Sequence, residues 1–216
     1  MIRVLAALAL LGGMAQAQTP PADAGLEAAL HNFPPAILGG NVQPVTTPGD
    51  PMPPPCPAAG GRVEQKGGPT IEFLGADPAN PELCHLRMGA DAVDAWFGIW
   101  VTTWPGADYA HRAIARVLHS RTGDAVGFDT VPAPGFAYHD IIRHDGLETI
   151  NLLGNTYRAI KLAHYREGFD GNTYRSVSTL WIDTVTGLPI YATYQHIAGR
   201  PELDDPLIPT AIVPAH

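Results

Sequence analysis

The chain has 216 residues and a formal net charge of −8, with 13 Lys and Arg against 21 Asp and Glu. This acidic balance makes nucleic acid an unfavourable partner, and we expect none. Common phosphate-binding, dinucleotide-binding and hydrolase motifs (G-x-x-x-x-G-K, G-x-G-x-x-G, G-x-S-x-G and H-E-x-x-H) are missing from the sequence, so we assign no cofactor.

Residues 1–17 have the pattern of a secretory signal peptide. Arg3 precedes an apolar run at 4–11, and Ala15 and Ala17 occupy the small-residue positions of a cleavage site. The apolar run is shorter than the roughly 20 residues that a membrane-spanning helix needs, and no later stretch comes close. We expect cleavage after Ala17 and a periplasmic or secreted protein that does not span the membrane.

Residues 18–61 form a predicted proline-rich arm. Eleven of the 22 prolines lie between positions 18 and 57. Because proline fixes φ and lacks a backbone donor, this segment is expected to be extended and polyproline-like. Such an arm could dock on a partner protein of the cell envelope.

Cys56 and Cys84 are the only cysteines of the chain. In an oxidising compartment two thiols pair, so we predict one disulfide. The alternative, a pair of metal-ligating thiolates, is disfavoured because the sequence has no C-x-x-C spacing.

Residues 62–199 are predicted to form one mainly β (α+β) domain, a curved antiparallel sheet or meander with one amphipathic helix packed on it, and residues 200–216 an extended tail. Short β-like segments alternate with turn residues throughout the domain. The predicted strands are 62–65, 70–74, 83–88, 93–104, 125–130, 136–143, 148–153, 156–166, 174–183 and 190–197. A two-residue turn at Gly154-Asn155 makes the last four an antiparallel meander.

The segment 108–119 breaks the β rhythm and predicts the helix. Its apolar residues recur at the i, i+3, i+4, i+7 spacing of a helical stripe. These residues are Ala110, Ala113, Ile114, Val117 and Leu118. Asp108 is expected to cap the start, and Gly123 lies just past the end.

Trp96, Trp100 and Trp104 are spaced by four within the predicted strand 93–104. The poor helix formers between them favour a strand, whose one side would carry an aromatic row. Core packing is one explanation of this row. The other is an apolar ligand-binding surface, for which these three residues are our candidates.

Histidines next to aspartates supply the candidate catalytic residues His139, Asp140, His144 and Asp145. A spacing of five puts the two histidines on opposite faces of a regular strand, so a shared site needs a bulge or turn near Asp145-Gly146. Structural hydrogen bonding is the alternative, and we assign no metal. His164 and Arg166 begin a second polar segment and are also candidate ligand-binding residues.

The stretch W-I-D-T-V-T-G-L-P-I-Y at 181–191 predicts a strand, a turn and a returning strand. Asp183 can bond the turn backbone, Gly187 can adopt positive φ, and Trp181 and Tyr191 should meet across the hairpin. The stretch resembles the W-x-D-x-x-T-G-L-P segment of the periplasmic lipoprotein-carrier (LolA-like) superfamily. That resemblance implies a curved antiparallel sheet, covered by helices, whose concave apolar face receives acyl chains.

Three functions follow from the sequence. The first is a non-enzymatic binder of an apolar or lipid-like ligand in the cell envelope, held between the sheet and the helix. The second is a metal-dependent or hydrolytic protein centred on 139–145. The third is a structural envelope-interaction protein with proline-rich arms.

Overall fold

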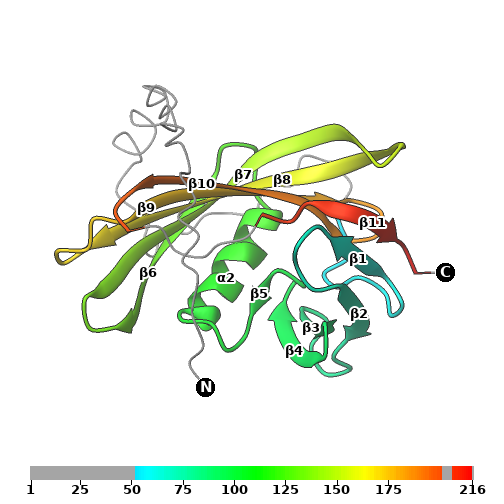
Figure 1. Cartoon of the computed structure of the whole chain (residues 1–216), viewed down its shortest axis with the longest axis horizontal. Helices are drawn as coiled ribbons and strands as arrows, with labels where there is room; N and C mark the ends of the chain where they lie inside the picture. The colour runs from blue at the N-terminus through cyan, green and yellow to red at the C-terminus, as the bar shows by residue number, and fades with distance from the viewer. Residues whose placement is uncertain (1–51, 201–205, 216) are drawn as a thin grey trace, which may run out of the picture. The chain divides into compact units, whose positions relative to one another are not determined.

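A computed structural model describes residues 52–200 and 206–215 of the chain. Across these residues it contains eleven β-strands in two antiparallel sheets and a single α-helix (Figure 1). The predicted mainly β fold with one helix is therefore confirmed. The predicted signal peptide at 1–17 and residues 18–51 of the predicted arm lie outside the described residues.

The first sheet has six strands in the order β11-β1-β2-β3-β4-β5. They are β1 Arg62–Gln65, β2 Ile71–Ala76, β3 Leu83–Met88, β4 Asp91–Trp96, β5 Trp100–Val101 and β11 Pro209–Val213. The predicted strands 62–65 and 70–74 correspond to β1 and β2, which pair antiparallel with Val63 opposite Ile71. β11 lies within the segment predicted as a tail and pairs with β1, where Arg62 faces Val213.

The second sheet contains the predicted meander together with β6, in the order β10-β9-β8-β7-β6. Its strands are β6 Ala125–Ala133, β7 Phe136–Leu152, β8 Asn155–Phe169, β9 Arg175–Asp183 and β10 Pro189–Ala198. Two predicted strands, 136–143 and 148–153, are parts of the single strand β7. The chain does not turn at Asp145-Gly146, because the register with β8 shifts there by a bulge instead.

Helix α2, Ala107–Leu118, matches the predicted helix to within one residue at each end and packs against β5, β6 and β7 (Figure 1). Its apolar stripe joins Phe128 and Ile142 of the five-stranded sheet in one buried cluster. The predicted cap is wrong: Gly106 is the N-cap residue, with φ 73° and no side-chain capping bond, and Asp108 lies in the first turn.

The structure splits the predicted strand 93–104 into β4 and β5. Phe97 and Gly98 between them have φ values of 54° and 66°, which reverse the chain and pair Trp96 with Trp100. Trp104 lies in the turn that precedes α2. The three tryptophans therefore do not form one row along a strand.

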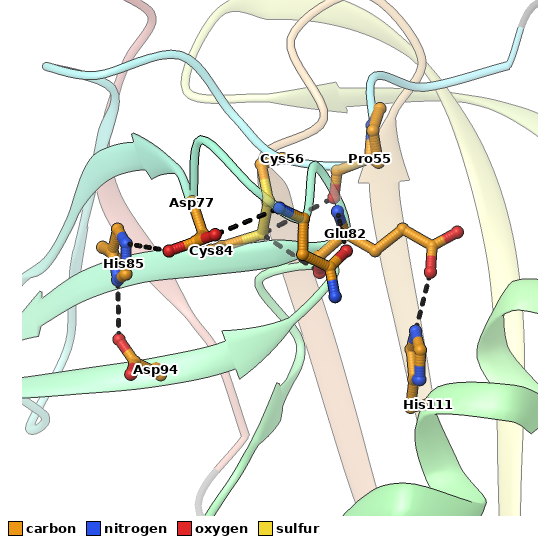
Figure 2. The surroundings of a disulfide bond; sticks show 9 residues. Pro55, Cys56, Asp77, Glu82, Cys84, His85, Asp94 and His111 are labelled. Atoms are coloured by element: carbon orange, nitrogen blue, oxygen red, sulfur yellow. Dashed lines mark hydrogen bonds and ion pairs between the residues drawn. A yellow bond between two sulfur atoms is a disulfide. The ribbon is translucent and has the colours of Figure 1, made fainter.

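The predicted disulfide joins Cys56 to Cys84 of β3 (Figure 2). Cys84 is completely buried, in a second apolar cluster with Val63, Phe73 and Ile190. Ala159 and Ile190 of the cluster belong to the five-stranded sheet, whereas Val63, Phe73 and Cys84 belong to the six-stranded sheet, so this cluster joins the two sheets. Figure 2 also shows His111 of α2, whose Nε2 lies 2.7 Å from a Glu82 carboxylate oxygen.

The hairpin between β9 and β10 follows its sequence prediction closely. The backbone N–H and hydroxyl of Thr186 both donate to the Asp183 carboxylate, at 2.9 and 2.6 Å. Trp181 and Tyr191 are register partners, with ring centroids 5.2 Å apart. Gly187 has φ 72°, and a Cβ at this position would lie 2.8 Å from the carbonyl oxygen of Pro54.

Replacing Gly187 by alanine is expected to lower the free energy of unfolding by about 2 kcal/mol, because left-handed backbone and a clash with Pro54 would add together. Urea unfolding measures the change. Gly154→Ala is the matched control, since Gly154 has φ 80° with no atom within 4 Å of an added Cβ. This control isolates the backbone cost, about 1 kcal/mol. Equal losses for both variants would contradict the predicted clash.

Among the described residues, no helix is both long and apolar enough to cross a membrane.

Candidate functional site

The described structure contains a cavity with a volume of about 760 Å³. It lies against the face of the five-stranded sheet that also packs on α2. Its other side is lined by β3, β4 and β5, the β1–β2 hairpin and residues 206–208. Most of the lining side chains are apolar, among them Ile99, Ile114, Ile142 and Leu207. Its volume is within the range of small-molecule sites.

Four of the five predicted ligand-binding residues line this cavity: Trp100, Trp104, His164 and Arg166. The tryptophans reach it from β5 and the following turn, and the two polar residues from β8. The Trp100 ring lies 5.3 Å from the His164 ring and 6.0 Å from that of Trp104, both edge to face.

Trp96 is not part of the cavity wall. Its ring stacks on His111 of α2, with centroids 4.0 Å apart and an interplanar angle of 21°. His111 also contacts Glu82, the residue before β3. Trp96 and Glu82 therefore both attach α2, through His111, to the six-stranded sheet.

A buried carboxylate organises the polar part of the wall. Asp140 is 0% exposed, and its Oδ1 accepts from Arg166 Nε at 2.8 Å and lies 2.7 Å from His164 Nε2. Its Oδ2 accepts the Thr130 hydroxyl at 2.7 Å. The partners of Asp140 thus come from β6 and β8, the two strands next to β7, and both carboxylate oxygens have hydrogen-bond partners.

The pKa of Asp140 reflects this network. Burial raises the pKa, but the hydrogen bonds and positive charges of His164 and Arg166 outweigh burial and lower it from 3.8 to about 2. Asp140 is therefore ionised at neutral pH. Arg166 also lies with its Cζ 4.9 Å from the centre of the Tyr138 ring, which further fixes the guanidinium.

The four candidate catalytic residues have separate surroundings. Exposed His139 contacts Asp129 and stacks on Phe169, whereas His144 is buried and Asp145 accepts from Arg143. Asp140 instead joins the cavity network. Among residues 52–200 and 206–215, no group of three or more His, Cys, Asp or Glu side chains is placed to hold a metal ion.

Sequence reasoning missed Thr130, Ser178 and Tyr194, which also line the cavity. Ser178 lies opposite both His164 and Tyr194 in the sheet register. Only the strand register identifies these residues, because isolated Ser, Thr and Tyr residues in strands carry no sequence pattern of their own.

The structure leaves the cavity and its Asp140 network as the strongest candidate site. Comparisons of the chain with protein-family models, with curated proteins and with solved structures gave no match.

Proposed function

We propose that this is an exported, non-enzymatic binding protein that holds an apolar or lipid-like ligand in the cavity lined by its two sheets. The cavity of about 760 Å³ with its largely apolar wall is the observation that carries the proposal. Removing an apolar ligand from water into such a space gains roughly 25 cal/mol for each Å² of apolar surface buried.

The cavity favours binding over the alternative of a catalytic site at 139–145. The side chains of that segment are paired with different partners, and only Asp140 belongs to the cavity network. In that network Asp140 keeps His164 and Arg166 in place. A binding site needs such a positioning residue even when it catalyses no reaction. The proposal also includes export, directed by the predicted signal peptide at 1–17, and a location in the cell envelope.

The proposal predicts saturable uptake of N-phenyl-1-naphthylamine, an uncharged fluorophore that brightens in apolar surroundings. Ala192 lines the cavity, so Ala192→Phe fills part of the space and should weaken binding of the probe at least about tenfold, about 1.4 kcal/mol. A fluorescence titration of the full chain at neutral pH measures both constants.

Ala92→Phe is the matched control, because it adds the same group at an exposed position of β4 that does not line the cavity. This variant should bind the probe as the wild type does. No saturable binding by wild-type protein, or equal binding by the wild type and Ala192→Phe, would overturn the proposed function.

A further inference from the structure

The cavity wall on strands β8, β9 and β10 has an apolar row and a polar row. Neighbouring residues within each row are register partners, and the two rows are two residues apart along each strand, so both project from one face of the sheet. The apolar row is Leu162, Leu180 and Ala192, and the polar row is His164, Ser178 and Tyr194. A ligand that spans both rows needs an apolar body with a polar group at one end.

Asp140 determines which ring nitrogen of His164 carries a hydrogen. The carboxylate accepts from the Thr130 hydroxyl and the Arg166 guanidinium, so it is an ionised group that only accepts. His164 Nε2, 2.7 Å from the same carboxylate, must therefore be a donor. Arg166 already balances the charge of Asp140, and a second cation on the same oxygen atom would leave an unbalanced positive charge. The His164 ring is accordingly neutral, with its hydrogen on Nε2 and a bare lone pair on Nδ1.

Nδ1 of His164 is an acceptor that the protein leaves available. No donor in the described part of the chain bonds to it, yet it is not one of the buried nitrogen atoms that lack a partner, so it keeps accessible surface. The His164 side chain is 24% exposed, whereas that of Asp140 is completely buried. Because His164 lines the cavity, a ligand atom can reach this nitrogen from there.

Ser178 supplies a second polar group beside His164. It is the register partner of His164 on β9 and lines the cavity, and its hydroxyl bonds to no other residue within 52–200 and 206–215. The hydroxyl of Tyr194, the next residue of the row, is instead 2.9 Å from that of Tyr174. The available atoms of the polar row are thus the His164 nitrogen, which only accepts, and the Ser178 hydroxyl, which can both donate and accept.

From this arrangement we infer that the ligand is a neutral amphiphile with a hydroxyl head, such as a long-chain alcohol, whose alkyl chain lies along the apolar row. The hydroxyl donates its hydrogen to His164 Nδ1 and accepts one from Ser178. A carboxylate or an ester has no hydrogen to donate, so its oxygen atoms would face the lone pair of Nδ1. This inference rests on the proposed function, because it names the ligand class of the same cavity.

The test compares ligands with the same twelve-carbon chain. 1-Dodecanol carries the hydroxyl, 1-methoxydodecane has a methyl group in place of its hydrogen, and dodecanoate has an ionised head that only accepts. Each is titrated below its solubility limit against the full chain loaded with N-phenyl-1-naphthylamine, at about pH 8, where histidine is normally neutral. The alcohol should bind at least about fivefold more tightly than the ether or dodecanoate, which bind through the chain alone.

A histidine variant locates the head. His164→Phe keeps a ring and removes both nitrogen atoms, while Asp140 retains its two other donors. The preference for the alcohol over the ether should fall at least about fivefold, and ether binding should stay within about threefold of wild type. His85→Phe is the matched control, because His85 also contacts an aspartate, Asp94, but does not line the cavity. This variant should keep the wild-type preference.

Nitrogen NMR of wild-type protein gives a reading that does not depend on the folding of a variant. The ring signals of His164, assigned by through-bond experiments, should show a hydrogen on Nε2 and none on Nδ1. 1-Dodecanol should shift the Nδ1 signal in the direction of hydrogen bonding, whereas 1-methoxydodecane should not, because only the alcohol can donate.

The outcomes separate the two proposals. An alcohol preference that is absent from wild type, or that survives in His164→Phe, would overturn the hydroxyl-head inference and leave apolar binding intact. A His164 ring with its hydrogen on Nδ1 would also overturn it. No uptake of the neutral fluorophore, together with no effect of any of the three ligands on the NMR signals, would overturn the proposed function as well.

Discussion

Replacing Asp140 by alanine is expected to lower the free energy of unfolding by about 3 kcal/mol, because it leaves the Arg166 guanidinium and the Thr130 hydroxyl without their shared acceptor. Chemical denaturation at neutral pH measures this loss. Asp129→Ala is the matched control: Asp129 also contacts a histidine, His139, but both side chains are about half exposed. The control should change stability by less than about 1 kcal/mol. Equal effects of the two variants would contradict the role of Asp140.

The same carboxylate gives stability a defined dependence on pH. The pKa of Asp140 in the folded protein, about 2, is below its ordinary value of 3.8, so ionisation favours folding. This contribution, about 2 kcal/mol, is complete above about pH 5 and is lost as the pH falls towards 2. Asp140→Asn has no such group, so its stability should fall less than that of wild type over this interval. Parallel pH profiles would contradict the lowered pKa.

Removing the disulfide is expected to have the largest effect on stability. The bond joins cysteines 28 residues apart, and the chain-entropy relation for a loop of this length gives roughly 3.6 kcal/mol. The double variant Cys56→Ala with Cys84→Ala is suitable because Cys84 is buried and alanine introduces no hydroxyl there. Its urea unfolding midpoint should fall strongly.

Wild-type protein unfolded in the presence of a reductant is the control for the cysteine variant. It should unfold with a similar loss of stability, whereas reductant should not alter the double variant. A double variant as stable as oxidised wild type would contradict a stabilising disulfide.

Local sequence patterns predict most of the helices and strands, because the conformation of each of these segments is determined mainly by its own residues. The apolar stripe of α2 and the turn signals around Asp183 needed no information from elsewhere in the chain. The hairpin between β4 and β5 escaped prediction because Phe97 adopts positive φ, which is uncommon for a residue other than glycine. Packing of Phe97 in the core with Trp100 and α2 accompanies this conformation.

The site was harder to predict than the fold because it depends on strand register. A turn at Gly154-Asn155 would place Asp140 opposite Phe169. The turn instead lies at Leu153-Gly154, and the bulge at Asp145 shifts the strands by one further residue, so that Asp140 faces Arg166. Local patterns therefore indicate Asp140, His164 and Arg166 separately, and only the strand register brings the three side chains together.

The three tryptophans show what local reasoning can and cannot place. Trp100 and Trp104 were proposed as a ligand surface for their large apolar area, and both line the cavity although the strand that was to carry them is broken. Trp96 was proposed on the same ground but stacks on His111. The aromatic residues indicate the segment 96–104, whereas the chain reversal at Phe97 determines which of its rings face the cavity.

Native mass spectrometry of the full chain, purified without detergent, tests the central claim of an apolar-ligand cavity most directly. The protein should carry, or take up on addition of dodecanoate, one ligand per chain, and Ala192→Phe should lose this adduct while Ala92→Phe keeps it. A bare protein mass for the wild type, unchanged after addition of dodecanoate and of methyl dodecanoate, would contradict the claim.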